Sequence, residues 1–321
     1  MGTPDLAATV LDQVLALESG TVVAVYCQPD RPAGRGMTLK APPVKELAAL
    51  HNIPVLQPRN FKDDGDVAQL RAYRPDYLLV AAYGLILPRR VLEIPSRMPL
   101  NVHTSLLPLY RGAAPIQRAI MDGRQESGVT IMRMEAGLDT GPIILQERVA
   151  IGPDDTAEDL HDLLALVGGK LLATALEGLE RGELSCTPQD DGRATYAAKL
   201  EKADGYLDFS RLGADIDARR RGVTPWPGAF ATFTCGEGEP LDVKILNGRP
   251  YNGPLLPEAV SLPPGSVLPK LVENALAVIC ADGLYLITEL RPAGRKRMDA
   301  AAFMNGYRKD RCGACFALPQ V

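Results

Sequence analysis

The sequence has few cysteines and no long hydrophobic run, and each scarcity excludes a class of protein. Six cysteines scattered over 321 residues are too few for a disulfide framework. No uninterrupted apolar stretch approaches the roughly 20 residues that a membrane helix requires, so no membrane partner is expected. The N-terminus also lacks the basic flank and apolar core of an export signal. Together these features predict a protein of the cytoplasm.

Paired metal ligands and the dinucleotide-binding glycine motif are missing as well. Cys312 and Cys315 form a Cys-x-x-Cys pair, but the sequence offers no second pair that would complete a zinc site. We therefore expect no metal and a reduced, inert tail. The early turn Gly2-Thr3-Pro4 is not Gly-x-Gly-x-x-Gly, which argues against a dehydrogenase that binds nicotinamide.

The net charge of −4 hides an asymmetry along the chain. From residue 203 to the end, 14 Lys and Arg stand against 13 Asp and Glu, whereas the whole chain holds 35 against 39. This less acidic part carries two basic clusters, Arg219 to Arg221 and Arg295 to Arg297. Such clusters are compatible with docking a structured RNA, although most basic runs are simply solvated faces.

Strand and helix patterns alternate in the first half of the chain. Apolar runs at 21–27 and 76–83 suit strands buried on both faces, and helical spacing occurs between them at 44–51 and 67–73. This alternation predicts an α/β fold with a doubly wound parallel sheet. The sequence further predicts strands at 53–56, 100–103 and 128–135, a helix from Pro115, and a long helix over 156–180.

Beyond residue 184 the pattern changes to short segments separated by Gly and Pro. A short helix at 215–221 is followed by expected strands at 229–235, 241–246, 265–269, 276–281 and 284–290. About five short strands with such turns predict a small β-barrel of the oligonucleotide-binding type, by analogy. The length suffices for two cores. We expect a first domain at 1–184, a linker at 185–202 and the barrel domain at 203–321.

An amide, an imidazole and a carboxylate stand near strand ends of the first domain. Asn101 and His103 end one expected strand, and Asp139 follows the next. Ligands of open α/β sheets bind beyond the carboxyl ends of the strands, so these three side chains are expected in one crevice. They could bind a carbonyl oxygen, stabilise the charge that develops on it and move a proton. Singly, His103 could equally be a buried histidine and Asp139 a turn former.

A basic segment runs from Arg31 to Lys45 without an acidic residue. Its Gly and Pro content disfavours a regular element and favours a long exposed loop. Loops of this kind make salt-dependent contacts with phosphates. The segment is thus a candidate for binding RNA through Arg31, Arg35, Lys40 and Lys45.

Several segments resemble the methionyl-tRNA formyltransferase family, and the resemblance covers nearly the whole chain. Asn-x-His within 101–120, SLLP at 105–108 and GLDTG at 137–141 are shared by folate-dependent formyltransferases in general. QPDRPAGRG at 28–36, PWPGAF at 225–230 and PAGRKRM at 292–298 indicate the tRNA-directed members. The resemblance implies a Rossmann-like formyl-transfer domain followed by a barrel that helps to hold initiator tRNA.

The implied reaction moves a formyl group from 10-formyltetrahydrofolate to the α-amino group of initiator methionyl-tRNA, for translation initiation. The enzyme would act as a monomer and without a metal. Asn101 and protonated His103 would stabilise the oxyanion, and Asp139 would favour the imidazolium and accept a proton from the amine.

The resemblance also implies contacts for both substrates. Folate would contact Ser105, Leu106, Leu107 and Pro108 in one segment and Tyr83, Gly84, Leu85, Ile86 and Leu87 in another, although Leu106 or Leu107 singly could merely fill the core. The tRNA would contact Arg31, Arg35, Lys40, Lys45, Arg295, Lys296 and Arg297, with Arg35 at the position that matches the family's acceptor-stem loop.

The resemblance begins at a point where family members have already completed a strand, since Met1 stands just before GTPD at 2–5. We therefore expect the first, central strand of the sheet to be missing, and a misassigned start codon as the cause. Two other functions stay open: the same three catalytic residues could formylate an amino sugar nucleotide, or the chain could bind tRNA without catalysis.

Overall fold

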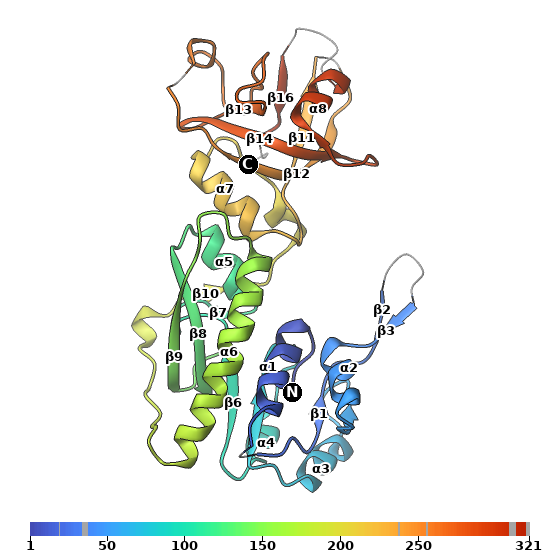
Figure 1. Ribbon diagram of the computed structural model, residues 1–321, viewed down its shortest axis with the longest axis vertical. Coiled ribbons are helices and arrows are strands. Elements are labelled where there is room, and N and C mark those ends of the chain that lie inside the picture. Colours follow the sequence, from blue (N-terminus) through green and yellow to red (C-terminus); the bar gives the residue numbers. More distant parts are fainter. Residues whose placement is uncertain (19, 34–37, 237, 255, 308–312, 319–321) are drawn as a thin grey trace. The chain divides into compact units, whose positions relative to one another are not determined.

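The computed structural model describes residues 1–18, 20–33, 38–236, 238–254, 256–307 and 313–318 (Figure 1). The chain divides into two compact units. The first unit comprises Met1–Pro115, Glu126–Ala150 and Asp159–Ala198, and the second comprises Ile116–Gln125, Ile151–Glu158 and Lys199–Val321. Each unit has its own core, and each is described by itself.

The first unit contains two pieces of central β-sheet (Figure 1). In one piece, β1 (Val25–Tyr26) pairs in parallel with β4 (Val55–Leu56). The other has the order β5 (Tyr77–Val80), β6 (Met98–His103), β8 (Glu126–Arg133), β9 (Ile143–Ala150). The predicted parallel pairing holds for β1–β4 and β5–β6 but is wrong for β8, which runs antiparallel to both β6 and β9. The sheet is mixed because β8 enters it antiparallel to β6, and the loop at 134–142 then returns the chain antiparallel into β9.

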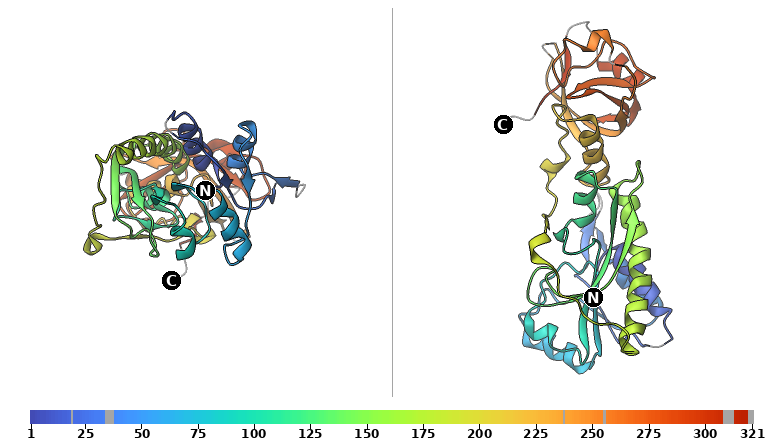
Figure 2. Two further views of the ribbon diagram at one scale, coloured as in Figure 1. Left: turned by 90° about the horizontal axis from the view of Figure 1, so that it is seen from below. Right: turned by 90° about the vertical axis from the view of Figure 1, so that its left-hand side faces the viewer.

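The helices of the first unit are α1 (Asp5–Leu15), α2 (Pro43–Leu50), α3 (Asp64–Ala72), α4 (Arg89–Leu92) and most of α6 (Ala157–Glu180), whereas α5 (Pro115–Met121) belongs almost wholly to the second unit. Those expected near 44–51, 67–73 and 156–180 are confirmed, whereas α1 and strand β9 were not expected. Helix α6 packs closely on the sheet and on α1 through two glycines (Figure 2). A Cβ at Gly168 would lie 2.8 Å from Val102, and one at Gly169 would lie 2.6 Å from Gln13.

The two sheet pieces are joined at one end by the first two residues. Gly2 N donates to Tyr26 O at 2.9 Å, and Ala81 N donates to Met1 O at 2.9 Å. Next to Met1 lies a cavity of about 440 Å³, which is lined by residues 22–26 and 77–81 and which α1 and α6 help to enclose. Among the described residues, β1 and β5 are thus bridged by Met1 and Gly2 and belong to separate pieces of sheet.

The second unit is an antiparallel sheet that is nearly closed into a barrel, as predicted. Its strand order is β13 (Leu276–Cys280), β14 (Gly283–Pro292), β12 (Leu241–Pro250), β11 (Phe230–Cys235), β16 (Ala314–Phe316), with β15 (Met298–Asp299) paired to β14. The strand predicted at 265–269 is wrong, because this segment makes bridges rather than a strand. Val267 N donates to Ala314 O at 2.9 Å and Ile279 N donates to Ser266 O at 2.8 Å, so the segment links β13 to β16.

Helices α7 (Gly213–Gly222) and α8 (Ala300–Tyr307) also belong to the second unit. The tail, expected to be inert, contributes β16 to the barrel. Phe316 is 1% exposed, and its ring centre lies 5.3 Å from that of Phe209 and 5.4 Å from that of Phe233. Cys315 lies in this strand, whereas Cys312 lies outside the described residues. Within the described ranges, no helix combines the length and apolarity needed to cross a membrane.

Candidate active site

Strand β6 places Asn101 and His103 on one face of the sheet, because side chains two residues apart in a strand point the same way. Asn101 pairs with Val80 and Met132, and His103 pairs with Thr130. His103 is 5% exposed and Asn101 is half-buried. Within the part of the chain that the structure describes, the Asn101 amide has no hydrogen-bond partner. A free amide and a buried imidazole therefore share one side of the strand.

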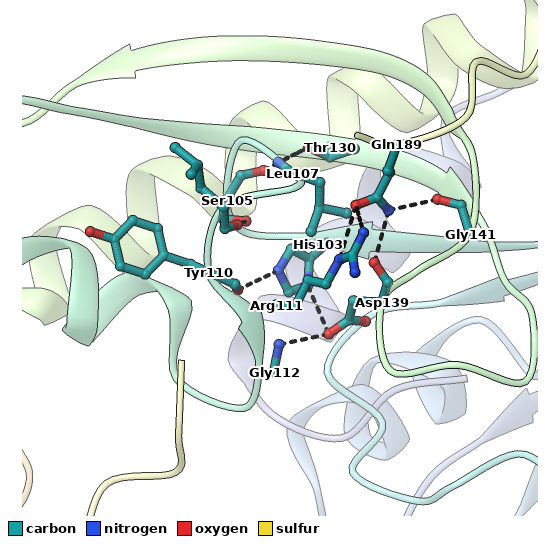
Figure 3. Close-up of polar contacts among 11 residues, drawn as sticks. His103, Ser105, Leu107, Tyr110, Arg111, Gly112, Thr130, Asp139, Gly141 and Gln189 are labelled. Atoms are coloured by element: carbon teal, nitrogen blue, oxygen red, sulfur yellow. Dashed lines mark hydrogen bonds and ion pairs between the residues drawn. The ribbon is translucent and has the colours of Figure 1, made fainter. Parts of the chain in front are cut away.

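The His103 ring is held between a carbonyl and a carboxylate (Figure 3). Nε2 lies 3.0 Å from Tyr110 O and donates to it, since a carbonyl oxygen only accepts. Nδ1 lies 3.7 Å from Asp139 Oδ2, which is too long for a hydrogen bond but short enough for an ion pair when the ring is protonated. Nδ1 is consequently the nitrogen that can exchange a proton with a reacting group.

Asp139 reaches His103 from the loop at 134–142, between β8 and β9. The end of β8 lies beside Leu100 rather than His103, because β8 is antiparallel to β6. The expectation of two strand ends at one edge was therefore wrong, although it led to two side chains that do lie close together. The loop turns back along β6 instead, and Gly112 N donates to Asp139 Oδ2 at 2.8 Å.

Gly141 allows this loop to close tightly on β8. A Cβ at this position would lie 1.8 Å from Arg133 O, closer than any real contact. Asp139 itself has a φ of +52°, a left-handed conformation that aspartate tolerates better than most residues. The GLDTG segment thus places a carboxylate at the end of a sharp turn.

Side chains of β8 and β9 hold the Ser105–Pro108 segment by hydrogen bonds to its backbone. The Thr130 hydroxyl donates to Ser105 O at 2.7 Å and accepts from Leu107 N at 3.1 Å. Gln146 Nε2 donates to Leu107 O and to the Thr130 hydroxyl, both at 2.8 Å. Leu107 is 3% exposed and fills the core, whereas Leu106 is half-buried. Of the two leucines, Leu106 is the one whose side chain can also meet a ligand.

The 83–87 segment exposes some side chains and buries others. Tyr83 and Leu87 belong to the core, and burial raises the pKa of Tyr83 well above its usual value. Ile86 is 95% exposed, while Leu85 is half-buried and Gly84 exposed. Side-chain contact with folate is thus open to Leu85 and Ile86, whereas Tyr83 is buried and its carbonyl oxygen already accepts from Thr3 and Gln28.

The basic segment at 31–45 is more ordered than expected. It forms a short hairpin of β2 (Arg31–Ala33) and β3 (Thr38–Lys40), so the prediction of an irregular loop is wrong at these positions. Arg31 and Lys40 are exposed on the hairpin, and Arg35 lies outside the described residues. The hairpin is too short to have been recognised among Gly and Pro by hydrophobic alternation.

Lys45 differs from the other basic residues of this segment because it is engaged in an ion pair. It lies on α2, where its Nζ is 2.8 Å from Asp30 and 2.9 Å from Gln57 Oε1. The hydrogen bonds from Lys45 and Gln57 lower the pKa of the Asp30 carboxyl. Asp30 stands one residue before the hairpin, so this cluster ties the base of the hairpin to α2.

The two basic clusters of the second unit also differ from each other. Arg295, Lys296 and Arg297 are exposed between β14 and β15, and Arg297 Nε lies 3.3 Å from Glu289. Of the other cluster, Arg220 and Arg221 form ion pairs with Asp217, at 2.9 and 2.8 Å. The residues at 295–297 therefore face solvent, whereas the buried Arg220 also donates to the Tyr285 hydroxyl and so ties α7 to β14.

Two polar residues beside Asp139 were missed by the sequence analysis. Arg111 is 2% exposed and Gln189 comes from the expected linker, and both contact the loop at 134–142 or each other. The burial of an arginine and the contact of a distant glutamine have no signal in a single sequence. In the described ranges, no group of three or more His, Cys, Asp or Glu residues could hold a metal ion.

Comparison with known proteins relates the chain to formyl transferases. The model of the formyl transferase family matches residues 1–176, and the model of the formyl transferase C-terminal domain matches residues 199–308. Among curated proteins, the methionyl-tRNA formyltransferase of Nitratidesulfovibrio vulgaris (strain DP4) is 48% identical over 315 residues, which cover 98% of this chain and 94% of that protein. The methionyl-tRNA formyltransferase of Parvibaculum lavamentivorans is 46% identical, with 96% of each chain covered.

Solved structures share the fold at lower identity. The sugar 3N-formyl transferase WlaRD, crystallised with dTDP and 5-N-formyl-THF, superposes with a TM-score of 0.63 at 18% identity, over 92% of this chain and 97% of that chain. HypX from Aquifex aeolicus in complex with tetrahydrofolic acid superposes with a TM-score of 0.56 at 21% identity, over 83% and 45%. Since the sequence matches extend over almost the full length of both partners, the chain belongs to the methionyl-tRNA formyltransferase family.

Proposed function

We propose that this enzyme transfers the formyl group of 10-formyltetrahydrofolate to the α-amino group of initiator methionyl-tRNA, with Asn101, His103 and Asp139 as its catalytic residues. The observation that carries the proposal is the arrangement of these residues: a buried imidazole lies 3.7 Å from a carboxylate and shares one face of β6 with an unpaired amide. The relationship to curated methionyl-tRNA formyltransferases supports the choice of substrates.

The reaction needs charge stabilisation more than a strong base. An α-amino group has a pKa of roughly 7.7–8.0, so a useful neutral fraction exists near neutral pH. The amine nitrogen attacks the formyl carbon, the bond from that carbon to the folate nitrogen breaks, the amine loses one proton and the folate nitrogen gains one. Negative charge develops on the formyl oxygen during the attack, and the site must stabilise it.

Asn101 and His103 are suited to that oxygen. The Asn101 amide can donate two hydrogen bonds, and within the described residues neither is taken by the protein. His103 uses Nε2 to hold its position on Tyr110 O, and a proton on Nδ1 faces the side of the ring where Asp139 lies. Removal of one donor of this kind typically raises the barrier by about 2.7–4 kcal/mol.

Asp139 stabilises the protonated ring and is the candidate acceptor for the proton of the amine. The distance between Nδ1 and Oδ2 leaves both atoms able to contact a reacting group, whereas a direct hydrogen bond would occupy them. Gly112 N keeps Oδ2 in place at 2.8 Å. The carboxylate therefore needs no large movement to take part in proton transfer.

The described residues fit a folate co-substrate beside this trio. Ser105, Leu106, Leu107 and Pro108 form a segment whose backbone is bound by Thr130 and Gln146, so the half-buried side chain of Leu106 is held in place for a ligand. The side chain of Ile86 is 95% exposed and therefore free to pack against the ring system of the co-substrate. When bound, the co-substrate supplies the activated formyl group.

For tRNA, the proposal uses the exposed basic residues. Arg31 and Lys40 lie on the β2–β3 hairpin with Arg35 between them in sequence, and Arg295, Lys296 and Arg297 lie in the β14–β15 turn. Such residues contribute phosphate contacts whose strength falls with salt. Lys45 is retained as a weaker candidate, because its ion pair with Asp30 competes with phosphate.

The proposal also covers the context in which the enzyme works. We place it in the cytoplasm as a monomer, with 1–184 as the catalytic domain, 185–202 as a linker and 203–321 as the barrel domain. The matches of the two family models, to 1–176 and 199–308, support this division.

The direct test is a formylation assay with the purified protein and 10-formyltetrahydrofolate. Charged initiator tRNA should be formylated, whereas an amino sugar nucleotide should not, and formylation should decline as salt rises. Turnover of the sugar nucleotide alone would favour the rival formyl transfer. Binding of tRNA without any turnover would support a noncatalytic protein and contradict the proposed roles of Asn101, His103 and Asp139.

A further inference from the structure

We infer that Gln189 and Arg111 are positioning residues that hold the Asp139 loop in the conformation presenting its carboxylate to His103. The inference rests on the proposed catalytic role of Asp139. Gln189 lies in the segment that was expected to be a linker, so the inference assigns part of that segment to the active site. Its basis is a set of hydrogen bonds that joins segments some 50 and 80 positions apart in the chain (Figure 3).

Gln189 holds the loop by its backbone. Its Nε2 donates to Asp139 O at 2.8 Å and to Gly141 O at 2.6 Å. One amide group therefore clamps the carbonyls on either side of Thr140. Asp139 has a φ of +52°, a left-handed conformation that costs free energy even for aspartate, so the contacts from Gln189 favour this turn. The position of the Asp139 carboxylate depends on this turn.

Arg111 determines which way the Gln189 amide points. Its Nε and one terminal nitrogen donate to Gln189 Oε1, at 3.1 and 2.9 Å. A guanidinium has donors and no acceptor, so it must face the oxygen and leave Nε2 to the loop. The same guanidinium donates to Asp191 at 2.7 Å. Burial lowers the pKa of Arg111, but the hydrogen bonds and charges of Asp191 and Tyr196 outweigh it and raise the pKa above its usual value, so the group stays charged.

The segment that carries Gln189 is itself fixed on both sides. Thr187 and Ile143 exchange two backbone hydrogen bonds, each 2.8 Å long, at the start of β9. Further on, β10 (Tyr196–Ala197) pairs in parallel with β7 (Arg111–Gly112). Residues 187–197 are therefore held against the site by backbone hydrogen bonds at both ends of the segment.

Strand β7 supports Asp139 through both of its residues. Arg111 orients Gln189, and Gly112 N donates to Asp139 Oδ2 at 2.8 Å. Gly112 has a φ of +119°, and a Cβ there would lie 2.7 Å from Ala197 O, so β10 can approach only a glycine. The carboxylate and the turn below it are thus held by the same pair of strands.

The chemistry of the clamp demands glutamine at 189. A glutamate would set a carboxylate oxygen against the two loop carbonyls, and a methionine would fill the space without donating. A displacement of about 1 Å at a reacting group can cost about 100-fold in rate. We therefore expect Gln189→Glu and Gln189→Met each to lower kcat by about 30- to 100-fold, with KM for methionyl-tRNA and for formylfolate changed less than about threefold.

A double-mutant cycle separates positioning from general stability. Once Asp139→Asn has removed the catalytic carboxylate, Gln189→Glu should lower kcat less than about threefold further, because a clamp for an absent group has nothing left to position. Gln69→Glu is the matched control, since Gln69 is exposed on α3 in the same unit and the change in charge is identical. The melting temperature is measured for every variant, and Gln189→Met replaces Gln189→Glu if the latter does not fold.

The inference is overturned by multiplicative losses in the double variant or by unchanged kcat in both Gln189 variants. It is also overturned if KM rises while kcat stays constant. Failure of the proposed function gives a different pattern, in which Asp139→Asn by itself retains wild-type kcat. A loss of kcat in both single variants that fails to accumulate in the double variant supports the clamp.

Discussion

His103 Nδ1 lies 3.7 Å from Asp139 Oδ2, while Nε2 of the same ring is committed to Tyr110 O at 3.0 Å. The ring is therefore held by a hydrogen bond through Nε2, while Nδ1 lies close enough to Asp139 for an ion pair when the ring is protonated. The carboxylate would stabilise a protonated Nδ1 without forming a direct hydrogen bond to it. Both groups can therefore still contact a substrate that approaches between or beside them.

Replacement of Asp139 by asparagine should lower kcat by about 10²- to 10⁴-fold, the usual range for removal of a general base. The side chain keeps its shape but loses the charge that favours the imidazolium. KM for methionyl-tRNA should change little, because the tRNA is expected to bind through distant basic residues. Steady-state formylation kinetics with charged tRNA measure both quantities.

His161 and Asp162 provide a matched control for that variant. Their Nδ1 and Oδ1 atoms lie 3.0 Å apart on α6, but the Asp162 side chain is 75% exposed. Asp162→Asn should leave kcat unchanged. Equal losses of kcat and of tRNA binding in Asp139→Asn, or equal kcat in the two variants, would contradict the assignment.

Much of the fold followed from apolar periodicity. Helix α6 and strands β6 and β8 were predictable because long buried patterns leave little choice of element. Strand direction was not predictable in this way: β8 runs antiparallel to β6, which depends on how the connections pack in three dimensions. Strand β9 lacks strict alternation, because its first three residues are buried or half-buried and the next three are exposed, and so it gave a weak signal.

The site could be predicted in part. Asn101, His103 and Asp139 carry the chemistry and stand in recognisable segments, and the structure places His103 beside Asp139. Gln189 could not be found, because its contacts bridge 48 to 50 positions and nothing in its local sequence distinguishes it from a linker residue. Lys45 was grouped with the free basic residues, since the partner that engages it, Asp30, lies just before the segment considered.

Lys40 and Lys45 should respond differently to removal of their charge. Lys40 is exposed on β3, so Lys40→Ala should raise KM for methionyl-tRNA and reduce the salt dependence of log KM by about one unit of slope, with KM for formylfolate unchanged. Lys45→Met should instead lower the melting temperature, because Asp30 and Gln57 lose a shared donor. An identical response of the two variants in the salt titration would disprove this division.

Asp217 should be essential for the stability of the second unit. It accepts hydrogen bonds from Arg220 at 2.9 and 3.1 Å, from Arg221 at 2.8 Å and from the Tyr285 hydroxyl at 3.0 Å. Asp217→Asn removes the counterion of a buried arginine, which typically costs about 3–5 kcal/mol. Urea unfolding followed by the fluorescence of Trp226, the one tryptophan of the chain, reports on this unit. Asp215→Asn, exposed on the same helix, is the control, and coincident unfolding midpoints would refute the prediction.

In a protein whose chain starts at Met1 as printed, the amino group of this residue should make the stability of the first unit depend on pH. It donates to Leu79 O at 2.6 Å beside the cavity between β1 and β5, and burial lowers its pKa from 8.0 to about 5. Above pH 8 the group is neutral in both the folded and the unfolded chain and costs nothing. As pH falls from 8 to 5, the unfolded chain takes up a proton that the folded chain refuses, so the free energy of unfolding decreases.

Three pKa units correspond to about 4 kcal/mol, which is the full loss expected by pH 5. The measurement is urea unfolding of the chain as printed, followed by circular dichroism at several pH values between 5 and 8, against the same chain acetylated at Met1. Acetylation removes the titrating group, and the cavity has room for the added atoms. The acetylated chain should lose less stability over this interval, whereas parallel curves would show that the amino group stays charged and is solvated in the folded protein.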